Sequence, residues 1–463
     1  MTTPSRPPIV VLGAGLAGLA AARNLNRRGV PVRVLEAGTS VAGLAATTTE
    51  GGFVSDVGAH FITNRLAAAV GIGAACRPVA RYGESVLIGV RARTYPEGLV
   101  RVPRFVGSAL RARLTQTTTG HGSASERLRA EYGRALADEI AIPLIEAWSG
   151  VAADDLAASA ADKIPSGVFH ALRLRAAGTI SRRAVAIGYC ASAPEVAGVH
   201  HVYPVEGGVA AVCGALAAKL TSPVELERRV EAVVTDLGQV IGVRADGEDI
   251  EASAVVSSIP LPVLARLVDA PSPALDAARV FRFRSIVLVE LRLRGRALLP
   301  NVVNWVPDRG APYFRLTEPS QATPWTVPEG STAIVADCGS FVGDQVWNQR
   351  DEVTIDACTE ALRPRIPDID ARLQDAFVRR IPLGYPVFAR EYEPARRALT
   401  SGTGVGGLLS IGRNGEFAHI LMEDVYWRTQ RSIGALARGD ESTEQHDPNP
   451  VEAILGETAV TIA

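Results

Sequence analysis

Three glycines near the start of the chain have the type and spacing of a phosphate-binding turn. Gly13, Gly15 and Gly18 form G-x-G-x-x-G between an apolar run, Ile9 to Leu12, and a helical pattern. The first glycine permits the tight turn, the second lets backbone N–H groups approach a pyrophosphate, and the third lets the helix pack on the strand. The start of that helix then faces the phosphates. We expect cofactor contacts along the whole turn: Gly13, Ala14, Gly15, Leu16, Ala17 and Gly18.

A glutamate after the turn extends this prediction to a nucleoside. A second apolar run, residues 30–35, ends in Glu36. It stands about twenty residues past the turn, where a carboxylate can accept hydrogen bonds from a ribose diol. Ala37 follows and belongs to the same expected contact. Strand, turn, helix, strand and terminal glutamate together predict that the chain binds a dinucleotide that contains ADP.

The composition is that of a globular enzyme and excludes several other classes. The 463 residues are 47% hydrophobic and 21% charged with a net charge of −1, so we expect two or three domains and no nucleic-acid partner. Five cysteines stand without a C-x-x-C motif, and no metal site is predicted. No run reaches the ~18 apolar residues of a membrane span. The N-terminus carries the dinucleotide motif rather than a signal-peptide cleavage site, so a cytoplasmic protein is expected.

The segment after Glu36 resembles a known flavoprotein family. Its residues 43–47 read Gly-Leu-Ala-x-Thr, and residues 52–60 read Gly-Phe-x-x-Asp-x-Gly-x-His. This is similar to the second flavin-contacting segment of the flavin amine oxidase, protoporphyrinogen oxidase and phytoene desaturase superfamily. The resemblance implies FAD contacts at Gly43, Leu44, Gly58, Ala59 and His60. His60 would lie beside the flavin ring as a donor to flavin or substrate, and it is the one catalytic candidate; a packing histidine is the alternative.

Two later blocks continue the resemblance. The order of a Tyr-Pro turn, a helix, a hairpin that turns at Leu237-Gly238, and a buried strand at 254–259 implies that Val230 offers its backbone to adenine. Near the C-terminus, Gly412-Arg413 replaces the Gly-Asp of many relatives and resembles the subgroup of UDP-galactopyranose mutase. A helix that starts near Met422 would point its free N–H groups at the flavin pyrimidine.

The resemblance implies an α/β fold, in which a Rossmann-type FAD-binding domain is interrupted by a mixed-sheet substrate domain and a helical excursion. The helical pattern at 125–148 is expected to break at Pro143, and Trp148 is expected in a core. Aromatic and arginine side chains cluster in the sheet region, and we expect substrate contacts from Tyr313, Arg315 and Tyr385. The expected division is an FAD-binding domain of residues 1–75, 200–268 and 402–437, a helical part at 76–199, a mixed-sheet part at 269–401, and a polar tail at 438–463.

The implied function is an FAD-dependent oxidoreductase. A flavin supplies the redox chemistry, so the protein must bind a small-molecule substrate over N5 and orient it. The family lysine near N5 is absent from the strand around Arg284-Ser285-Ile286, which favours a dehydrogenase, desaturase or oxidase of a largely apolar substrate. FAD is expected to be noncovalent, because residues 406–437 hold no cysteine and only His419. O2 is a candidate electron acceptor.

A second function class stays open at this stage. In a non-redox flavoenzyme such as a sugar mutase, an isomerase or cyclase, the reduced flavin is a nucleophile and arginines such as Arg315 hold a diphosphate. The oxidation state that supports turnover separates the two classes.

Overall fold

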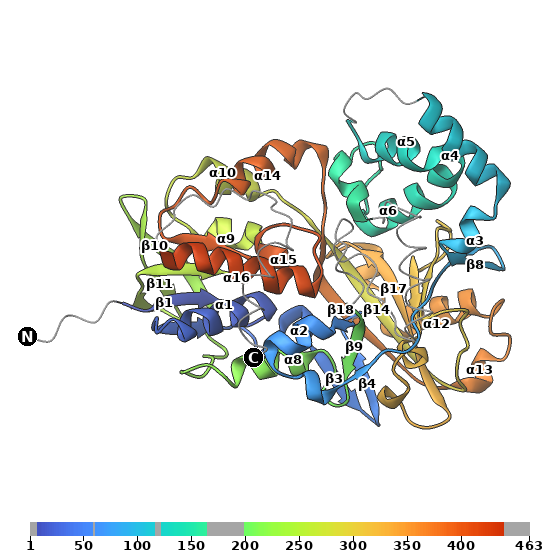
Figure 1. Ribbon diagram of the computed structural model, residues 1–463, viewed down its shortest axis with the longest axis horizontal. Helices are drawn as coiled ribbons and strands as arrows, with labels where there is room; N and C mark the ends of the chain where they lie inside the picture. The colour runs from blue at the N-terminus through green and yellow to red at the C-terminus, as the bar shows by residue number, and fades with distance from the viewer. Residues whose placement is uncertain (1–6, 59–60, 116–121, 164–198, 439–463) are drawn as a thin grey trace, which may run out of the picture.

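A computed structural model describes residues 7–58, 61–115, 122–163 and 199–438. The expected polar tail at 438–463 therefore lies almost wholly outside the described residues, as do Ala59 and His60. Figure 1 shows a dinucleotide-type unit on the left, a large sheet on the right and a helical lobe above that sheet.

The first unit is built on a four-stranded parallel sheet in the order β19-β13-β1-β2. Its strands are β1 (Ile9–Leu12), β2 (Val32–Leu35), β13 (Ala254–Ser257) and β19 (Leu408–Ser410). The predicted strand, turn, helix and strand are therefore present, with β2 two residues shorter than expected at its start. Because both faces of a parallel sheet are covered, these strands are short and apolar. Segments from the beginning, the middle and the end of the chain meet in this one sheet.

Two long helices lie side by side on this sheet. They are α1 (Leu16–Arg27) and α16 (Met422–Arg438). The α1 face toward the sheet is made of small residues such as Ala20 and Ala21, which are fully buried. Gln430 of α16 donates to the carbonyl of Ala20 (3.3 Å) and links the two helices. The third motif glycine, Gly18, allows this packing, because a Cβ there would lie 1.9 Å from the Gly13 carbonyl oxygen.

Smaller elements surround this unit. One hairpin, β3-β4, follows the glycine-rich loop. The hairpin that the sequence predicts is β10-β11, in the three-stranded sheet β10-β11-β12, with Leu237 and Gly238 at positive φ (48° and 77°) in its turn. The elements are β3 (Thr47–Glu50), β4 (Phe53–Asp56), β5 (Ile62–Thr63), α2 (Asn64–Val70), β6 (Cys76–Pro78), β9 (His201–Pro204), α8 (Ala210–Ala217), β10 (Val230–Asp236), β11 (Gln239–Ala245), β12 (Glu248–Glu251), α9 (Leu261–Leu267) and α10 (Pro273–Ala278).

The second unit is a seven-stranded mixed sheet in the order β18-β14-β17-β16-β15-β7-β8. Its long antiparallel strands are β14 (Phe283–Arg294), β17 (Ser331–Ser340) and β18 (Leu373–Pro386), followed by β15 (Val303–Trp305), β16 (Arg315–Thr317), β7 (Glu84–Ile88) and β8 (Arg91–Tyr95). Only the β15–β7 pair is parallel. One face packs on α12 (Asp351–Leu362), where Cys338 and Cys358 bring their sulfur atoms to 3.6 Å. Shorter helices α11 (Gln345–Asn348) and α13 (Ile369–Arg372) complete this region, whereas α14 (Glu393–Thr400) lies beside α10 (Figure 1).

The helical part differs from the sequence prediction in two respects. Residues 84–95, which were expected in the helical region 76–199, form the β7–β8 hairpin and extend the mixed sheet. The break expected at Pro143 occurs earlier, at Gly133 (φ 73°, ψ 154°) and a π-helical segment at 137–141. Pro143 lies in the first turn of its helix, where a missing N–H costs nothing. The helices are α3 (Glu97–Val100), α4 (Pro103–Thr115), α5 (Ala124–Leu136) and α6 (Ile142–Ser149).

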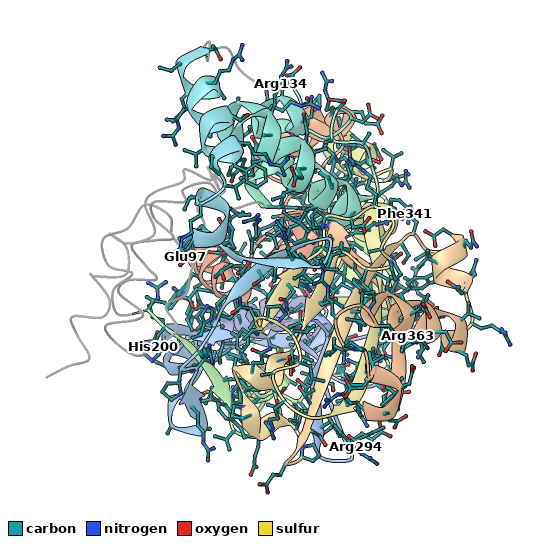
Figure 2. The ribbon with its side chains drawn as sticks, turned by 90° about the vertical axis from the view of Figure 1, so that its right-hand side faces the viewer. Glu97, Arg134, His200, Arg294, Phe341 and Arg363 are labelled. Atoms are coloured by element: carbon teal, nitrogen blue, oxygen red, sulfur yellow. The ribbon has the colours of Figure 1, made fainter. Side chains whose placement is uncertain are left out.

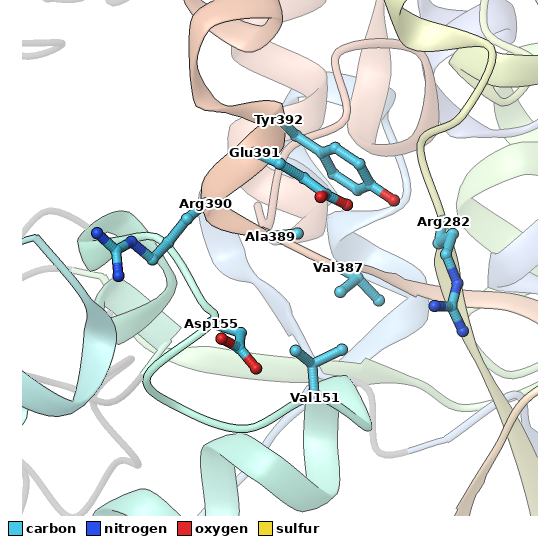
Figure 3. Close-up of a pocket in the computed structure, with 8 residues that line it drawn as sticks. All are labelled: Val151, Asp155, Arg282, Val387, Ala389, Arg390, Glu391 and Tyr392. Atoms are coloured by element: carbon cyan, nitrogen blue, oxygen red, sulfur yellow. The ribbon is translucent and has the colours of Figure 1, made fainter.

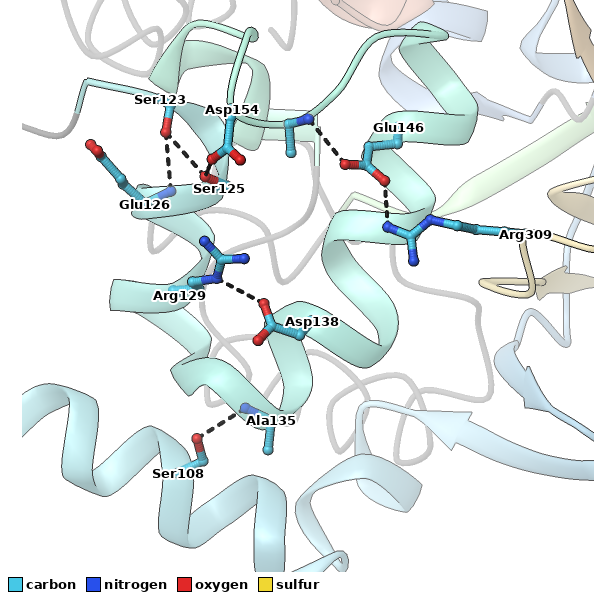
Figure 4. A network of polar contacts seen from close by, with 11 residues as sticks. Ser108, Ser123, Ser125, Glu126, Arg129, Ala135, Asp138, Glu146, Asp154 and Arg309 are labelled. Atoms are coloured by element: carbon cyan, nitrogen blue, oxygen red, sulfur yellow. Dashed lines mark hydrogen bonds and ion pairs between the residues drawn. The ribbon is translucent and has the colours of Figure 1, made fainter.

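Polar contacts hold this helical lobe together and tie it to the sheet region (Figure 4). Ser123 caps α5 by accepting from the backbone N–H of Glu126 (3.3 Å). Glu146 on α6 accepts from the backbone N–H of Ala153 (3.1 Å) and pairs with Arg309 (2.5 Å) across the boundary. Figure 2 shows Arg134 at the outer end of the lobe and Arg294 at the opposite end of the molecule. These contacts fix α6, and with it Trp148, against the sheet.

No helix of the described residues is long and apolar enough to cross a membrane.

The close approach at Gly18 generates a stability prediction. Gly18→Ala places a methyl group against the Gly13 carbonyl, where neither backbone can move without separating α1 from β1. We expect the free energy of unfolding to fall by about 3 kcal/mol or more, measured by urea denaturation. Gly214→Ala is the matched control, because Gly214 is an exposed helical glycine with open space around its Cβ position. It should gain up to about 1 kcal/mol. Equal stability of Gly18→Ala and the parent would contradict the assignment.

Candidate functional site

The glycine turn ends in a helix start that no side chain caps. Gly13 donates to the carbonyl of Leu35 (2.8 Å), which closes the turn onto β2. Gly15 is the N-cap of α1 without a side-chain hydrogen bond, and the first turn of α1 holds no acidic residue. The first N–H groups of a helix carry partial positive charge and need acceptors. This helix start can therefore accept an anionic group such as a phosphate.

Glu36 lies at the end of β2 directly beside that turn. One carboxylate oxygen accepts from the backbone N–H of Ala14 and the other from that of Gly38, each at 2.8 Å. An ionised carboxylate has about four acceptor sites, so both oxygens keep capacity for ribose hydroxyl groups. The Glu36 carbonyl in turn accepts from the N–H of Arg228 (2.9 Å), two residues before Val230 at the start of β10. The structure thus brings Val230 into the neighbourhood of Glu36 and Ala37.

The loop that carries Gly43 and Leu44 lies against the glycine turn. Ala42 donates to the carbonyl of Ala14 (2.9 Å), and a Cβ on Gly43 would lie 3.6 Å from the Cα of Gly15. Ala42 has a φ of 91°, a value that favours glycine and strains an L-residue. The strain explains physically why glycine suits this position better than alanine. The loop covers the turn on the side where phosphates are expected.

Gly412 and Arg413 connect the glycine turn to the sheet region. Gly412 has a φ of 78°, and a Cβ there would lie 2.5 Å from the Cβ of Ala17. The Arg413 side chain leads away from this contact. Its guanidinium donates to the carbonyl of Gly384 (3.3 Å) and lies 4.9 Å from the ring of Tyr385. A residue predicted to bind cofactor therefore reaches a residue predicted to bind substrate.

The helix predicted to start near Met422 begins at that residue. Glu423, in its first turn, pairs with Arg65 (2.7 Å), accepts from the indole of Trp427 (2.9 Å) and contacts Thr63. Burial raises the pKa of this carboxyl, and Arg65 opposes the rise. These contacts join the start of α16 to β5 and α2.

The segment around Gly58 is organised by an aspartate that sequence reasoning did not single out. Asp56 is half-buried and accepts from Thr47 (2.6 Å), from the Tyr203 hydroxyl (2.7 Å) and from the Val209 N–H (3.2 Å). Burial raises the pKa of Asp56, and these hydrogen bonds oppose the rise. Gly58 has a φ of 92° and donates to the Asp56 carbonyl (2.9 Å). The role predicted for the neighbouring His60 falls outside the described residues.

The three residues predicted to bind substrate do not all lie together. Tyr385 and Arg315 face the same region, which also holds Trp305 with its ring 5.6 Å from the Arg315 guanidinium. Tyr313 lies instead in the apolar core under α12, with Cys338 and Cys358. Arg315 and Asp337 pair across β16 and β17 at 2.5 Å in the interior. The charge of Arg315 is therefore already balanced by its neighbour.

A group of basic and aromatic side chains, which we name the cationic cluster, lies beside Tyr385. Its members are Lys163, Arg315, Arg413, Trp148, Tyr385 and His419. Lys163 is 7% exposed, and its ammonium lies 5.5–5.9 Å from the ring centroids of Trp148, Tyr385 and Phe388. The ring of His419 lies 5.6 Å from Trp148 and 5.7 Å from Tyr385.

Lys163 is the functional candidate that sequence reasoning missed. It belongs to the helical excursion rather than to the strand around Arg284, yet it donates to the carbonyl of Pro386, beside the strand pair Arg284–Tyr385. The one feature of the sequence that could have drawn attention to it is the rarity of lysine, because Lys163 and Lys219 are the only lysines among the 48 lysine and arginine residues. Trp148, expected in a core, is indeed buried, but its indole nitrogen finds no hydrogen-bond partner in the described part of the chain.

Burial and mutual repulsion shape the ionisation of the cationic cluster. Burial, followed by repulsion from Arg413 and Arg396, lowers the pKa of Lys163 to about 7. Burial also lowers the pKa of His419, and Lys163, Arg413 and Arg315 lower it further. Burial lowers the pKa of Arg413, Tyr385 opposes this fall and Arg315 adds to it, although an arginine stays protonated. His419 is therefore neutral at pH 7, while Lys163 is close to the midpoint of its titration.

A separate pocket lies behind the strand that contacts Lys163 (Figure 3). Val387 and Ala389 line it, whereas Phe388 between them contacts Lys163. Its volume is about 430 Å³, and the charged residues that line it are of both signs: Arg282 and Arg390, Asp155 and Glu391. These charges are accessible to water and balance one another. The cationic cluster therefore differs from this pocket in both burial and charge.

The lowered pKa of Lys163 predicts how stability depends on pH. Between pH 7 and about 10 the unfolded chain binds a proton at Lys163 that the folded chain does not, so folding stability should rise with pH there. Lys163→Met removes this term. As the pH rises, the free energy of unfolding of the wild type should increase relative to that of Lys163→Met by up to about 1.4 kcal/mol per pH unit. The measurement is urea unfolding at pH 7, 8 and 9. Lys219→Met is the control, and its free energy of unfolding should change with pH as that of the wild type does. If Lys163→Met also shows the pH dependence of the wild type, the burial of an ionisable amine is refuted.

Known proteins resemble this chain in sequence. A family profile described as "Flavin containing amine oxidoreductase" matches residues 16–412. A candidate flavin-containing monoamine oxidase of Mycobacterium tuberculosis, AofH, is 41% identical over 83 residues, which are 17% of this chain and 18% of that protein's length.

Solved structures resemble the whole chain. Reduced UDP-galactopyranose mutase superposes with a TM-score of 0.77 at 18% identity over 97% of both chains. A candidate protoporphyrinogen oxidase from Exiguobacterium has a TM-score of 0.71 at 18% identity, over 94% of this chain and 99% of the other. These likenesses confirm the predicted α/β fold class. With a profile match that spans most of its length, the chain belongs to the family of flavin-containing amine oxidoreductases, which implies a flavin cofactor.

Proposed function

We propose that this protein is an FAD-dependent oxidoreductase that removes a hydride equivalent from a small, largely apolar organic substrate. The observation that carries the proposal is the continuity of two sites through Gly412-Arg413. Gly412 contacts the helix at the glycine turn, and Arg413 contacts Tyr385 in the cationic cluster. A cofactor that extends from the turn along this path has its reactive end beside buried aromatic side chains.

The residues of the turn fit the adenosine diphosphate part of FAD. An uncapped helix start suits a diphosphate, and Glu36 keeps acceptor capacity for a ribose diol. Gly43 and Leu44 would border the diphosphate, Val230 the adenine, and Gly58, Arg413 and Met422 the flavin end. We propose noncovalent attachment, because residues 406–437 contain no cysteine and their one histidine, His419, contacts Trp148 and Tyr385.

When bound, FAD supplies the hydride acceptor, so the substrate loses a hydride from carbon and a proton. The residues of this chain orient the substrate and exclude water. Trp148 and Tyr385 meet edge to face with centroids 5.7 Å apart and give an apolar substrate two aromatic surfaces. A role for His60 as hydrogen-bond donor to flavin or substrate remains part of the proposal, as do O2 as electron acceptor and a cytoplasmic location.

One alternative keeps support from a specific observation. Among the solved structures described above, UDP-galactopyranose mutase superposes with the higher TM-score, and Gly412-Arg413 occupies the position where the sequence resembles that subgroup. In that reading the protein is a non-redox isomerase or cyclase that works with reduced FAD. Arg413, rather than the ion-paired Arg315, is then the arginine with charge to offer a diphosphate.

The cofactor assignment predicts the colour and composition of the purified protein. It should be yellow with one FAD per chain, and acid precipitation should leave the colour in the supernatant. Glu36→Ala should weaken FAD binding by about tenfold to a hundredfold, because the ribose loses hydrogen bonds to a charged group. Glu225→Gln is the matched control, since that carboxylate pairs with Arg33 (2.8 Å) on the neighbouring segment. Unchanged FAD affinity of Glu36→Ala, or flavin in the acid pellet, would refute the corresponding assignment.

The redox assignment predicts activity from oxidised FAD. Anaerobic addition of a substrate should bleach the flavin band, and an acceptor should restore it, once in each turnover. The measurement is absorbance during anaerobic titration followed by admission of O2. Turnover that appears only after dithionite reduction, with a product isomeric to the substrate, would instead establish the mutase-like alternative.

A further inference from the structure

We propose that the substrate of this site is an anion, an aromatic or similarly flat apolar acid whose acidic group binds between Lys163 and Arg413. This inference rests on the proposed function and specifies its substrate class. It departs from the amine substrates that the family description suggests.

Lys163 is the first support. Its ammonium is buried, and within the described part of the chain its one hydrogen bond goes to the Pro386 carbonyl at 3.3 Å. An ammonium has three donors, and the ring faces of Trp148, Tyr385 and Phe388 replace only part of its hydration. A buried cation without a hydrogen-bonded counter-ion is costly. Lys163 therefore keeps donors for an acceptor that these residues do not provide.

Arg413 is the second support. Its side chain is partly buried, and its buried Nε finds no hydrogen-bond partner among the described residues. Its guanidinium donates to one backbone carbonyl, that of Gly384. Arg413 and His419 each keep part of their surface uncovered. A guanidinium with free donors suits the planar oxygens of a carboxylate or the oxygens of a phosphate.

The charge balance of the cationic cluster favours an anion over an amine. Arg315 is paired with Asp337, and Arg396 at the edge of the cluster pairs with Glu393 (2.7 Å). No carboxylate of the described residues makes a hydrogen bond or ion pair with Lys163 or Arg413 in this way. The charged groups that act on His419 are all basic: Lys163, Arg413 and Arg315. A protonated amine would add one more positive charge to this group, whereas an anion would relieve the repulsion.

The aromatic members define the rest of the substrate. Trp148 has neighbours on several sides, with Trp305 at 5.1 Å, Tyr385 at 5.7 Å and Phe314 at 6.2 Å between ring centroids. These rings stand beside the two free cations. An acid with an aromatic body can thus pack on the rings while its charged group reaches Lys163 and Arg413.

The FAD phosphates are a less suitable partner for these cations. They are expected at the start of α1, where Gly412 contacts Ala17. The Arg413 side chain points from there toward β18, to the carbonyl of Gly384 and the ring of Tyr385. Arg413 would also border the flavin end, as proposed above, and the experiment below separates that contact from substrate binding.

The experiment titrates the FAD-loaded protein with four probes of similar shape: benzoate, phenyl phosphate, benzyl alcohol and benzylamine. The readout is the shift of the flavin absorbance bands, with tryptophan fluorescence as a second signal. We expect benzoate or phenyl phosphate to bind at least about tenfold more tightly than benzyl alcohol, and benzylamine to bind most weakly. Equal or tighter binding of benzylamine, or no response to either anion, would overturn the proposal.

Variants connect the binding to the two cations. Lys163→Met and Arg413→Met should each weaken the bound anion by about tenfold to a hundredfold and leave benzyl alcohol unchanged. Lys163→Arg, which keeps the charge, should retain most of the anion affinity. Lys219→Met is the matched control, because Lys219 also donates to a backbone carbonyl, that of Val70 (2.8 Å), far from the cationic cluster. Circular dichroism and melting curves verify that each variant is folded.

A pH series gives a signature that a purely structural lysine would not produce. Anion binding should weaken between pH 6 and pH 9, as Lys163 loses its proton, and this dependence should disappear in Lys163→Met. The basic groups that face Lys163 are Arg413, Arg396 and His419, and the ring of Tyr385 lies beside them. The two arginines stay protonated, and burial lowers the pKa of His419, so Lys163 is the one of these basic groups that loses its proton between pH 6 and pH 9.

The possible failures are distinguishable. If Arg413→Met loses FAD while the affinity for benzoate stays unchanged, the cations hold the flavin and the substrate proposal is wrong. If the protein binds FAD and is reduced by an amine but not by any acid, the oxidoreductase assignment stands and the anionic substrate is refuted. If the protein binds no FAD, the proposed function itself fails.

Discussion

The contact between helix α1 and the glycine turn is the constraint on which the rest of the site depends. The helix can pack on β1 only because Gly18 leaves room for the Gly13 carbonyl, and its start remains uncapped only because Gly15 has no side chain. The same helix start touches Gly412, so the position of α1 also sets the origin of the Arg413 side chain. A backbone contact at one end of the molecule thereby determines where a buried charge is presented to the sheet region.

Local signals in the sequence predicted the elements whose structure is decided locally. The glycine turn and the turn at Leu237-Gly238 follow from spacing and from the residues that tolerate positive φ, and the structure confirms both. The β7–β8 hairpin was missed because its strands gain their stability from pairing with β15, more than 200 residues away. The helix break was placed at Pro143 instead of Gly133 because a proline in a first helical turn costs nothing.

The candidate site divides in the same manner. The cofactor contacts stay a prediction. They depend on backbone geometry, so they can be proposed from a motif of glycines and one acidic residue. The substrate region depends on side chains that come together from α6, β16, β18 and the segment before α16. No local sequence pattern predicts contacts between elements so far apart in the chain. Arg315 illustrates the limit, because its partner Asp337 follows only from the register of β16 and β17. Lys163 illustrates it further, since a single lysine at the end of a short 3-10 helix has no periodicity to interpret.

The order of strands in the parallel sheet has a consequence for biosynthesis. β13 lies between β1 and β19, so on a ribosome its outer edge and the apolar faces beside it stay unpaired until residues 408–410 have emerged. Helix α16, which covers α1, is made later still. The glycine turn is therefore made early, whereas the sheet and the helix layer around it are completed only near the end of synthesis, and we expect a flavin to be captured among the last events.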